Sequence, residues 1–221
     1  MIKKQVRSVV MLIESINASK PVNIHFNNQE VTTGIFKSPI KEPVRVTPFG
    51  LVGDTIVDKQ VHGGLDQAVY LYHAEDYAWW SKELSRTIDY GMFGENLTVS
   101  GLEDIAWLIG DRLMINDVML EITAPRVPCF KLTVRMGDNT FVKKFTNAIR
   151  PGAYARVINT GVVEVGDSIV IEKTPMDYAT VKEVFSVWHS KNKSQEVLKK
   201  ALASPLAWVY RQQIQSWYDG R

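Results

Sequence analysis

The sequence predicts a mainly β protein with some α structure: a closed or nearly closed β-barrel with peripheral helices, followed by a small module of three helices. Two observations carry this prediction. Short strand-like runs follow one another at close spacing from residue 8 to residue 172, with few helical patterns between them, which is typical of a barrel. At Pro175 the strand pattern stops, and Gly220 is the only glycine beyond it. We therefore assign residues 1–174 to a barrel domain and residues 175–221 to a helical module.

The strands of the first half are indicated by apolar runs and by the turns between them. They are expected at residues 8–16, 22–26, 30–32, 40–46, 55–59, 68–72 and 93–98. Asn27-Asn28 predicts a hairpin turn between the second and third of these strands. Prolines flank the fourth, which favours a short or edge strand because proline cannot donate to a sheet ladder.

The first helix is expected over residues 74–86, where Tyr77, Trp80 and Leu84 recur at helical spacing. After it, the turn Asn116-Asp117 predicts a second hairpin. The strands of that hairpin are residues 112–115 and 118–123. The barrel region is completed by short helices at residues 131–136 and 141–147 and by strands at residues 153–159 and 168–172.

The module after Pro175 is predicted from caps and apolar faces. Asp177 is a suitable N-cap for a helix that ends near His189, and Ser194 for a second helix. Ser204-Pro205 fits the N-cap and first position of a third. The three tryptophans of the module exceed what so small a unit can bury alone. We therefore expect it to dock on the barrel or on a second subunit, as in a homodimer.

Composition narrows the classes of function. The chain has 221 residues, of which 45% are hydrophobic and 23% charged, as is ordinary for a globular protein. A net charge of +2 gives no basic footprint, so nucleic-acid binding is not expected. No apolar run approaches the roughly 20 residues of a membrane helix, and the N-terminus lacks the pattern of a signal peptide. We expect a cytoplasmic protein without a membrane anchor.

Cys129 is the first candidate for chemistry, and it is the only cysteine. A lone cysteine excludes an intramolecular disulfide and a cysteine-based zinc site. Pro125 and Pro128 restrict the backbone before it, and Arg126 would lower the pKa of the thiol if it lies close. Cys129 is therefore a candidate soft nucleophile or metal ligand. The alternative is an inert, buried cysteine.

Two further stretches could bind a ligand. Gly63 and Gly64, which follow His62, allow backbone N–H groups to approach an anion closely; the alternative is a glycine-rich turn with a surface histidine. Glu95 could act as an acid or base, and the neighbouring Asn96 can both donate and accept hydrogen bonds. Each of these signals is weak when taken alone.

Together these stretches resemble the MOSC domain, a module found at the C-terminal end of molybdenum cofactor sulfurases. The matching segments are residues 53–54, 62–64, 68–70, 93–98, 110–113, 125–130 and 152–157. They occur in family order within residues 6–173. The helical tail resembles the three-helix extension of stand-alone bacterial members. One departure is Asp66-Gln67, where many relatives carry a lysine.

The resemblance implies a β-barrel that binds the molybdenum cofactor, a molybdopterin, with Cys129 as the ligand of molybdenum. It implies that the pocket is lined by Arg126, Pro128, Glu95, Asn96, His62, Gly63 and Gly64. The implied reaction is the two-electron reduction of small N-hydroxylated substrates, including hydroxylaminopurine-type base analogues, to amines. Electrons would come from a separate flavin-containing reductase. A soft thiolate suits molybdenum, and the cofactor would carry the cleavage of the N–O bond.

Two other functions use the same cysteine. Cys129 could carry a persulfide in sulfur transfer toward a metal cofactor, for which a lone thiolate is equally suitable. The protein could instead be a binding or storage module for the cofactor.

Overall fold

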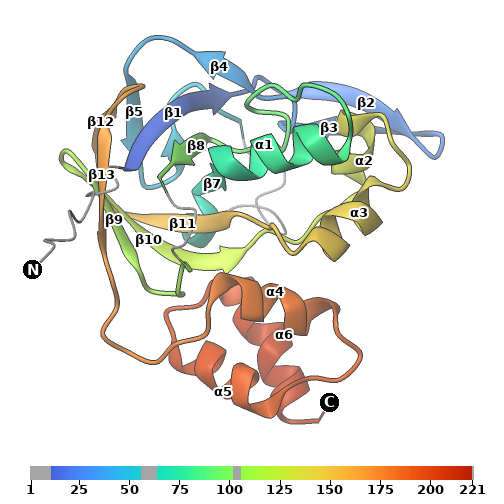
Figure 1. Cartoon of the computed structure of the whole chain (residues 1–221), viewed down its shortest axis with the longest axis vertical. Helices are drawn as coiled ribbons and strands as arrows, with labels where there is room; N and C mark the ends of the chain where they lie inside the picture. Colours follow the sequence, from blue (N-terminus) through green and yellow to red (C-terminus); the bar gives the residue numbers. More distant parts are fainter. Residues whose placement is uncertain (1–10, 56–63, 102–105, 221) are drawn as a thin grey trace, which may run out of the picture.

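A computed structural model describes residues 11–55, 64–101 and 106–220 of the chain. Its centre is a closed seven-stranded β-barrel (Figure 1). The order around the barrel is β13-β9-β10-β11-β7-β8-β1, and β1 pairs back with β13 to close it. The barrel strands are β1 (Met11–Ala18), β7 (Val69–His73), β8 (Leu97–Ser100), β9 (Arg112–Ile115), β10 (Val118–Pro125), β11 (Ala153–Asn159) and β13 (Ser168–Glu172). The predicted closed barrel is confirmed.

Six barrel pairings are antiparallel, and β7 with β8 is the parallel one. A parallel pair needs a crossover connection, which α1 (Ala74–Glu83) supplies on the outside of the barrel. Apolar side chains from alternate positions fill the interior, and Leu71, Leu97 and Leu113 have no exposed surface. The barrel interior is thus a packed core.

Smaller strands extend the barrel. The edge strand β4 (Ser38–Ile40) pairs with β1. A separate hairpin consists of β2 (Val22–Phe26) and β3 (Gln29–Thr33), joined by Asn27 and Asn28 with φ of 50° and 60°, as the sequence predicted. A three-stranded sheet contains β5 (Val44–Thr47), β6 (Gly50–Leu51) and β12 (Gly161–Val163). The run expected at residues 40–46 is therefore divided between β4 and β5, and residues 56–59 of the run at 55–59 lie outside the described part.

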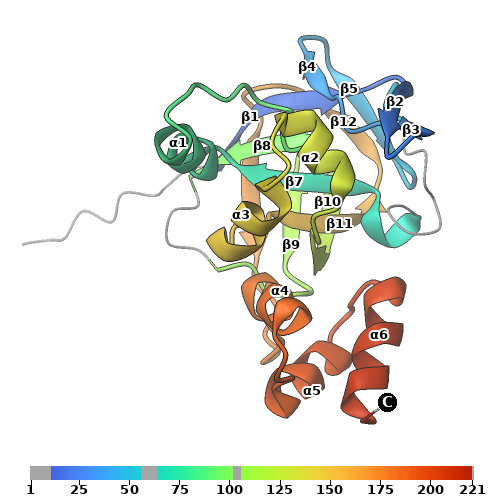
Figure 2. The same ribbon diagram turned by 90° about the vertical axis from the view of Figure 1, so that its right-hand side faces the viewer.

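Three helices cover one side of the barrel (Figure 2). They pack around a cluster of aromatic side chains. They are α1, α2 (Phe130–Met136) and α3 (Phe141–Ala148). The centre of the Phe93 ring lies 4.4 Å from that of Tyr72 and 5.8 Å from that of Trp80. From α3, Phe141 packs against Trp80, and Phe145 packs against Phe93. This cluster fixes the position of α2, whose first residue follows Cys129.

The C-terminal helices α4 (Val181–His189), α5 (Gln195–Ala203) and α6 (Trp208–Tyr218) lie together against one end of the barrel (Figures 1 and 2). Leu198, Tyr210 and Ile214 belong to the same hydrophobic cluster as the barrel interior. Of the two docking sites expected for the module, the structure shows the barrel. None of the helices in the described ranges combines the length and the apolar character needed to cross a bilayer.

Two predicted helix starts in this module were wrong. Helix α4 is capped by Thr180, not Asp177, because Thr180 and Glu183 form a reciprocal capping box with bonds of 2.7 and 3.1 Å. Helix α6 begins after Ala207, not at Ser204-Pro205. The Ser204 hydroxyl instead donates to the Ala201 carbonyl at 2.7 Å and helps to end α5. The predicted Ser194 cap of α5 is confirmed.

Candidate functional site

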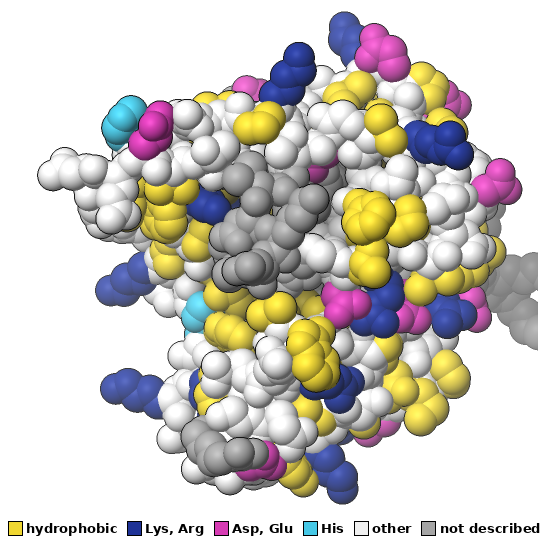
Figure 3. Space-filling model, turned by 180° about the vertical axis from the view of Figure 1, so that it is seen from behind, with side chains coloured by type: hydrophobic (Ala, Val, Ile, Leu, Met, Phe, Trp, Pro, Cys, Tyr) yellow, Lys and Arg dark blue, Asp and Glu magenta, His cyan; other side chains and the backbone are white. Residues whose placement is uncertain are grey.

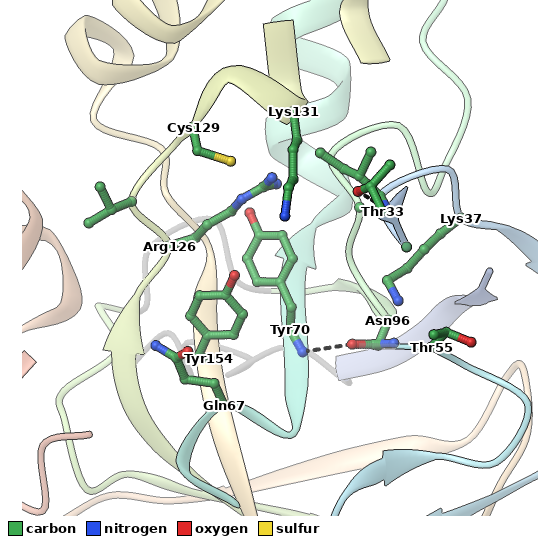
Figure 4. Close-up of a pocket in the computed structure, with 14 residues that line it drawn as sticks. Thr33, Lys37, Thr55, Gln67, Tyr70, Asn96, Arg126, Cys129, Lys131 and Tyr154 are labelled. Atoms are coloured by element: carbon green, nitrogen blue, oxygen red, sulfur yellow. Dashed lines mark hydrogen bonds between the residues drawn. The ribbon is translucent and has the colours of Figure 1, made fainter. Parts of the chain in front are cut away.

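One pocket brings together most of the reactive side chains (Figure 4). It lies between the β10–α2 segment, strands β7 and β11, and the segment after β3. Its lining comprises Thr33, Gly34, Ile35, Lys37, Thr55, Gln67, Tyr70, Gly94, Asn96, Arg126, Val127, Cys129, Lys131 and Tyr154. The walls therefore come from segments that are up to about half of the chain apart in sequence, and only the closed barrel places them side by side.

Cys129 lies at the rim of this pocket. It has extended backbone, with φ of −132°, and immediately precedes α2. Its side chain is half-buried and free of disulfide bonding, and it points toward the pocket, where Arg126 and Lys131 also point (Figure 4). Cys129 is therefore not fully buried, unlike the inert, buried cysteine of the alternative interpretation. Whether it acts as a nucleophile or as a metal ligand stays a prediction.

Arg126 is a fixed cation in the wall. Only 6% of it is exposed; its guanidinium donates to the Phe93 carbonyl and lies 5.1 Å from the centre of the Tyr70 ring. Burial works to lower the pKa of Arg126, but the neighbouring hydroxyls of Tyr70 and Tyr154 and the thiol of Cys129 outweigh it, so that the net shift is upward. The positive charge is therefore retained at the pocket.

Lys37 and Asn96 form the opposite wall. Lys37 makes an ion pair with Asp54, and its pKa is lowered by burial. The Asn96 amide donates to Asp54 at 2.8 Å and accepts from the backbone N–H of Tyr70 at 3.0 Å (Figure 4). The amide nitrogen and the amide oxygen of Asn96 are thus both hydrogen-bonded within the protein. Asn96 links Asp54 to β7 and also lines the pocket.

Gly94 and Gln67 are two further features of the lining. Gly94 has φ of +73°, and a Cβ there would lie 2.8 Å from the Ile35 side chain, so only glycine permits this close approach. Gln67 is 4% exposed, and its Oε1 has no hydrogen-bond partner within the described residues. A buried, unpaired amide oxygen is costly, and an N–H group of a ligand would satisfy it.

The structure brings together three of the residues that the sequence indicated: Cys129, Arg126 and Asn96. It does not bring Glu95 to the pocket surface, because this carboxylate is fully buried. Pro128 and Gly64 are outside the lining, although Gly64 precedes the short 3₁₀ helix η1 (Leu65–Gln67), which carries Gln67. His62 and Gly63 lie outside the described residues.

Glu95 is instead the centre of a buried hydrogen-bond network. Its Oε1 accepts from the Tyr77 hydroxyl at 2.6 Å, the Gly91 N–H at 2.7 Å, the Thr98 hydroxyl at 2.8 Å and the Asn17 amide at 3.4 Å. Burial raises the pKa of Glu95, against these hydrogen bonds. The network ties α1, β8, β1 and the Gly91 turn together directly behind Asn96.

Sequence reasoning did not select most of the lining, including five residues with large polar or charged side chains. Tyr70 was interpreted as core packing, and Lys37, Lys131, Gln67 and Tyr154 were not selected. Tyr70 and Tyr154 lie within the matching segments 68–70 and 152–157, and Lys131 directly follows the segment 125–130, so these three could have been found from the segments. Lys37 is outside every such segment, and its place in the wall depends on the turn that follows β3.

The side chains of the pocket offer donors and acceptors of the kinds that a molybdopterin would need. A thiolate is a suitable molybdenum ligand, Arg126 and Lys131 suit a phosphate, and Gln67 can accept from a ring N–H. No group of three or more His, Cys, Asp or Glu side chains converges anywhere in the described ranges. A single protein thiolate such as that of Cys129 suits a group that brings further metal ligands of its own.

Comparison with known proteins supports this interpretation of the fold. A sequence model of the MOSC domain matches residues 58–170. The uncharacterized protein YflK of Bacillus subtilis (strain 168) is 36% identical over 155 residues, which are 70% of each chain. A protein of Gibberella moniliformis named as a reductase is 32% identical over 181 residues, which cover 80% of this chain but only 32% of that protein. The crystal structure of YiiM from Geobacillus stearothermophilus is 26% identical, has a TM-score of 0.78, and covers 94% of this chain and 99% of its own.

Proposed function

The chain belongs to the MOSC domain family, and from this premise we propose that it is a molybdenum-cofactor-dependent oxidoreductase that reduces N-hydroxylated compounds to amines. The substrates would include hydroxylaminopurine-type base analogues, so that the activity removes damaging bases. The observation that carries the proposal is the single thiol of Cys129 at a pocket to which Arg126 and Lys131 also contribute. A similar protein named as a reductase supports oxidoreductase chemistry.

The residues of the pocket would divide the work of binding. Cys129 would supply a thiolate ligand to molybdenum. Arg126, which is already held by the Phe93 carbonyl, and Lys131 would bind the phosphate of the cofactor. Gln67 would orient the pterin by accepting one of its N–H groups. When bound, the molybdenum cofactor would supply the two-electron redox chemistry.

The reaction balances with two electrons and two protons for each substrate. The N–O bond is broken, an N–H bond is formed, and the oxygen leaves as water. The region matched by this chain is only 32% of the Gibberella reductase. We propose that the electrons come from a separate flavin-containing reductase.

The proposal is tested by metal analysis and turnover of the same preparation. Protein purified from a host that makes the cofactor is expected to contain about one molybdenum per chain. With reduced methyl viologen as electron donor, it should convert 6-N-hydroxylaminopurine to adenine. The control is the same protein from a host that cannot make the cofactor, which should lack both molybdenum and turnover.

Other outcomes would favour the other functions of this cysteine. Bound molybdenum without turnover would contradict the reductase and support a storage protein. A mass increase of one sulfur on Cys129 that a reductant removes, in protein without molybdenum, would instead support a sulfur carrier.

A further inference from the structure

The segment that carries Cys129 is held from outside the barrel by the C-terminal helices. The Tyr210 hydroxyl on α6 donates to the carbonyl of Pro125 at 2.7 Å. Tyr210 is 5% exposed, and its ring packs against Trp188 of α4 with the centroids 4.8 Å apart. This hydrogen bond joins residues 85 positions apart, and its acceptor directly precedes Arg126. A movement of α6 would therefore act on the Arg126–Cys129 wall of the pocket.

A second contact fixes the beginning of α6. The Ala207 N-cap has no side-chain cap of its own. The Asp66 carboxylate accepts from the Trp208 N–H at 2.9 Å and pairs with Arg156 at 3.0 Å. Arg156 also donates to the Pro205 carbonyl at 2.8 Å. Asp66 thus caps α6 from η1 of the barrel region, and a carboxylate is favourable there because the helix dipole is positive at its N-terminus.

The two contacts lie at the junction of the barrel and the helices, where charged side chains of both signs gather on the face shown in Figure 3. Asp66 directly precedes Gln67, which lines the pocket. The backbone carbonyl of Asp66 accepts from the Thr123 hydroxyl at 2.5 Å. Ala207 donates to the carbonyl of Thr123 at 3.1 Å. One connected set of hydrogen bonds therefore joins α6 to both η1, which carries Gln67, and the end of β10.

We infer that the C-terminal helices are part of the functional site, with Tyr210 and Asp66 as positioning residues for the segment that carries Arg126 and Cys129. Tyr210 acts directly on the Pro125 carbonyl. Asp66 acts through α6, because it fixes the end of the helix from which Tyr210 projects. The functional meaning of this arrangement rests on the proposed function, but the mechanical coupling does not.

The coupling can be measured without cofactor, because Cys129 is the only cysteine. The rate at which iodoacetamide alkylates this half-buried thiol at one fixed pH reports how well the segment and its neighbours shield it. Tyr210→Phe removes only the hydroxyl and is expected to raise this rate roughly five- to tenfold, since one hydrogen bond to the segment is lost. The matched control is Ile214→Val on the same helix, which loosens the buried face of α6 and leaves the Pro125 bond intact.

Ile214→Val is expected to lower the melting temperature while the alkylation rate stays within about twofold of wild type. Equal acceleration in both variants would overturn the inference, because general loosening would then explain the effect. An unchanged rate in Tyr210→Phe would also overturn it.

Asp66 is tested by graded substitution and by a double variant. Asp66→Ala should accelerate alkylation, and Asp66→Asn should accelerate it less, because the amide oxygen can still accept from Trp208. Asp66→Ala combined with Tyr210→Phe should react little faster than Tyr210→Phe alone, since both changes act through one hydroxyl. Full additivity would contradict a shared route. Absence of molybdenum in the wild type would overturn the proposed function and leave these rates unaffected.

Discussion

Cys129→Ser protein, purified from a host that makes the cofactor, is expected to retain less than about a tenth of the molybdenum of the wild type. Serine fills nearly the same space, but its oxygen is a hard donor that stays protonated at neutral pH, whereas molybdenum accepts a soft thiolate. Loss of turnover should follow the loss of metal. Molybdenum measured by mass spectrometry against protein concentration, in parallel preparations, checks the prediction.

The same variant also distinguishes a metal-ligand role of Cys129 from a purely structural role. Cys129 is half-buried and lies outside both hydrophobic clusters, so Cys129→Ser should unfold at nearly the wild-type urea concentration. Cys129→Ala should behave as Cys129→Ser does in both respects. Retention of the full amount of molybdenum in either variant would show that another residue holds the metal.

Glu95→Ala is expected to lower the free energy of unfolding by about 3–5 kcal/mol. The substitution leaves four donors inside the protein without their acceptor, among them the Tyr77 hydroxyl and the Gly91 N–H, and it creates a cavity at a fully buried position. Urea unfolding followed by circular dichroism measures the loss. The matched control is Glu164→Ala, an exposed glutamate in the turn before β13, which should change stability by no more than about 0.5 kcal/mol.

The pH dependence of Glu95 has a definite sign. Burial raises its pKa in the folded protein, so the folded state keeps the proton to a higher pH than the unfolded state does. The stabilisation from the protonated form is complete below the pKa of the unfolded chain and is lost as the pH rises through the pKa of the folded protein. Glu95→Gln cannot titrate, and it should therefore remove this part of the decline in stability with rising pH. An identical slope in wild type and Glu95→Gln would contradict the assignment.

The strands and hairpins could be predicted from the sequence because they depend on local patterns. Apolar runs ended by turns such as Asn27-Asn28 and Asn116-Asp117 placed the hairpins at their observed positions. The segments around Asn96 and Cys129 were found through their likeness to a family, and the structure places these two residues in one pocket.

What could not be predicted depends on partners from distant parts of the chain. The start of α6 was missed because Asp66, far away in sequence, provides its cap. Glu95 was interpreted as a pocket residue because the sequence does not reveal its hydrogen-bond partners. Two of them, Asn17 and Tyr77, come from other elements of the fold. Asp66 stood out only as a departure from related sequences, and its pairing with Arg156 accounts for a carboxylate at this position.

The closure of the barrel also has a consequence for how the protein is made. β1 pairs with β13 through Met11 with Ile169 and Leu12 with Ser168, so a growing chain cannot complete the barrel until almost all of that region has left the ribosome. Pairings of such long sequence separation form slowly, because the entropy of closing the loop is lost before the contacts are gained. Tyr210 emerges later still. A nascent chain therefore exposes Cys129 before its pocket exists. On the proposed function, cofactor loading would follow completion of the chain.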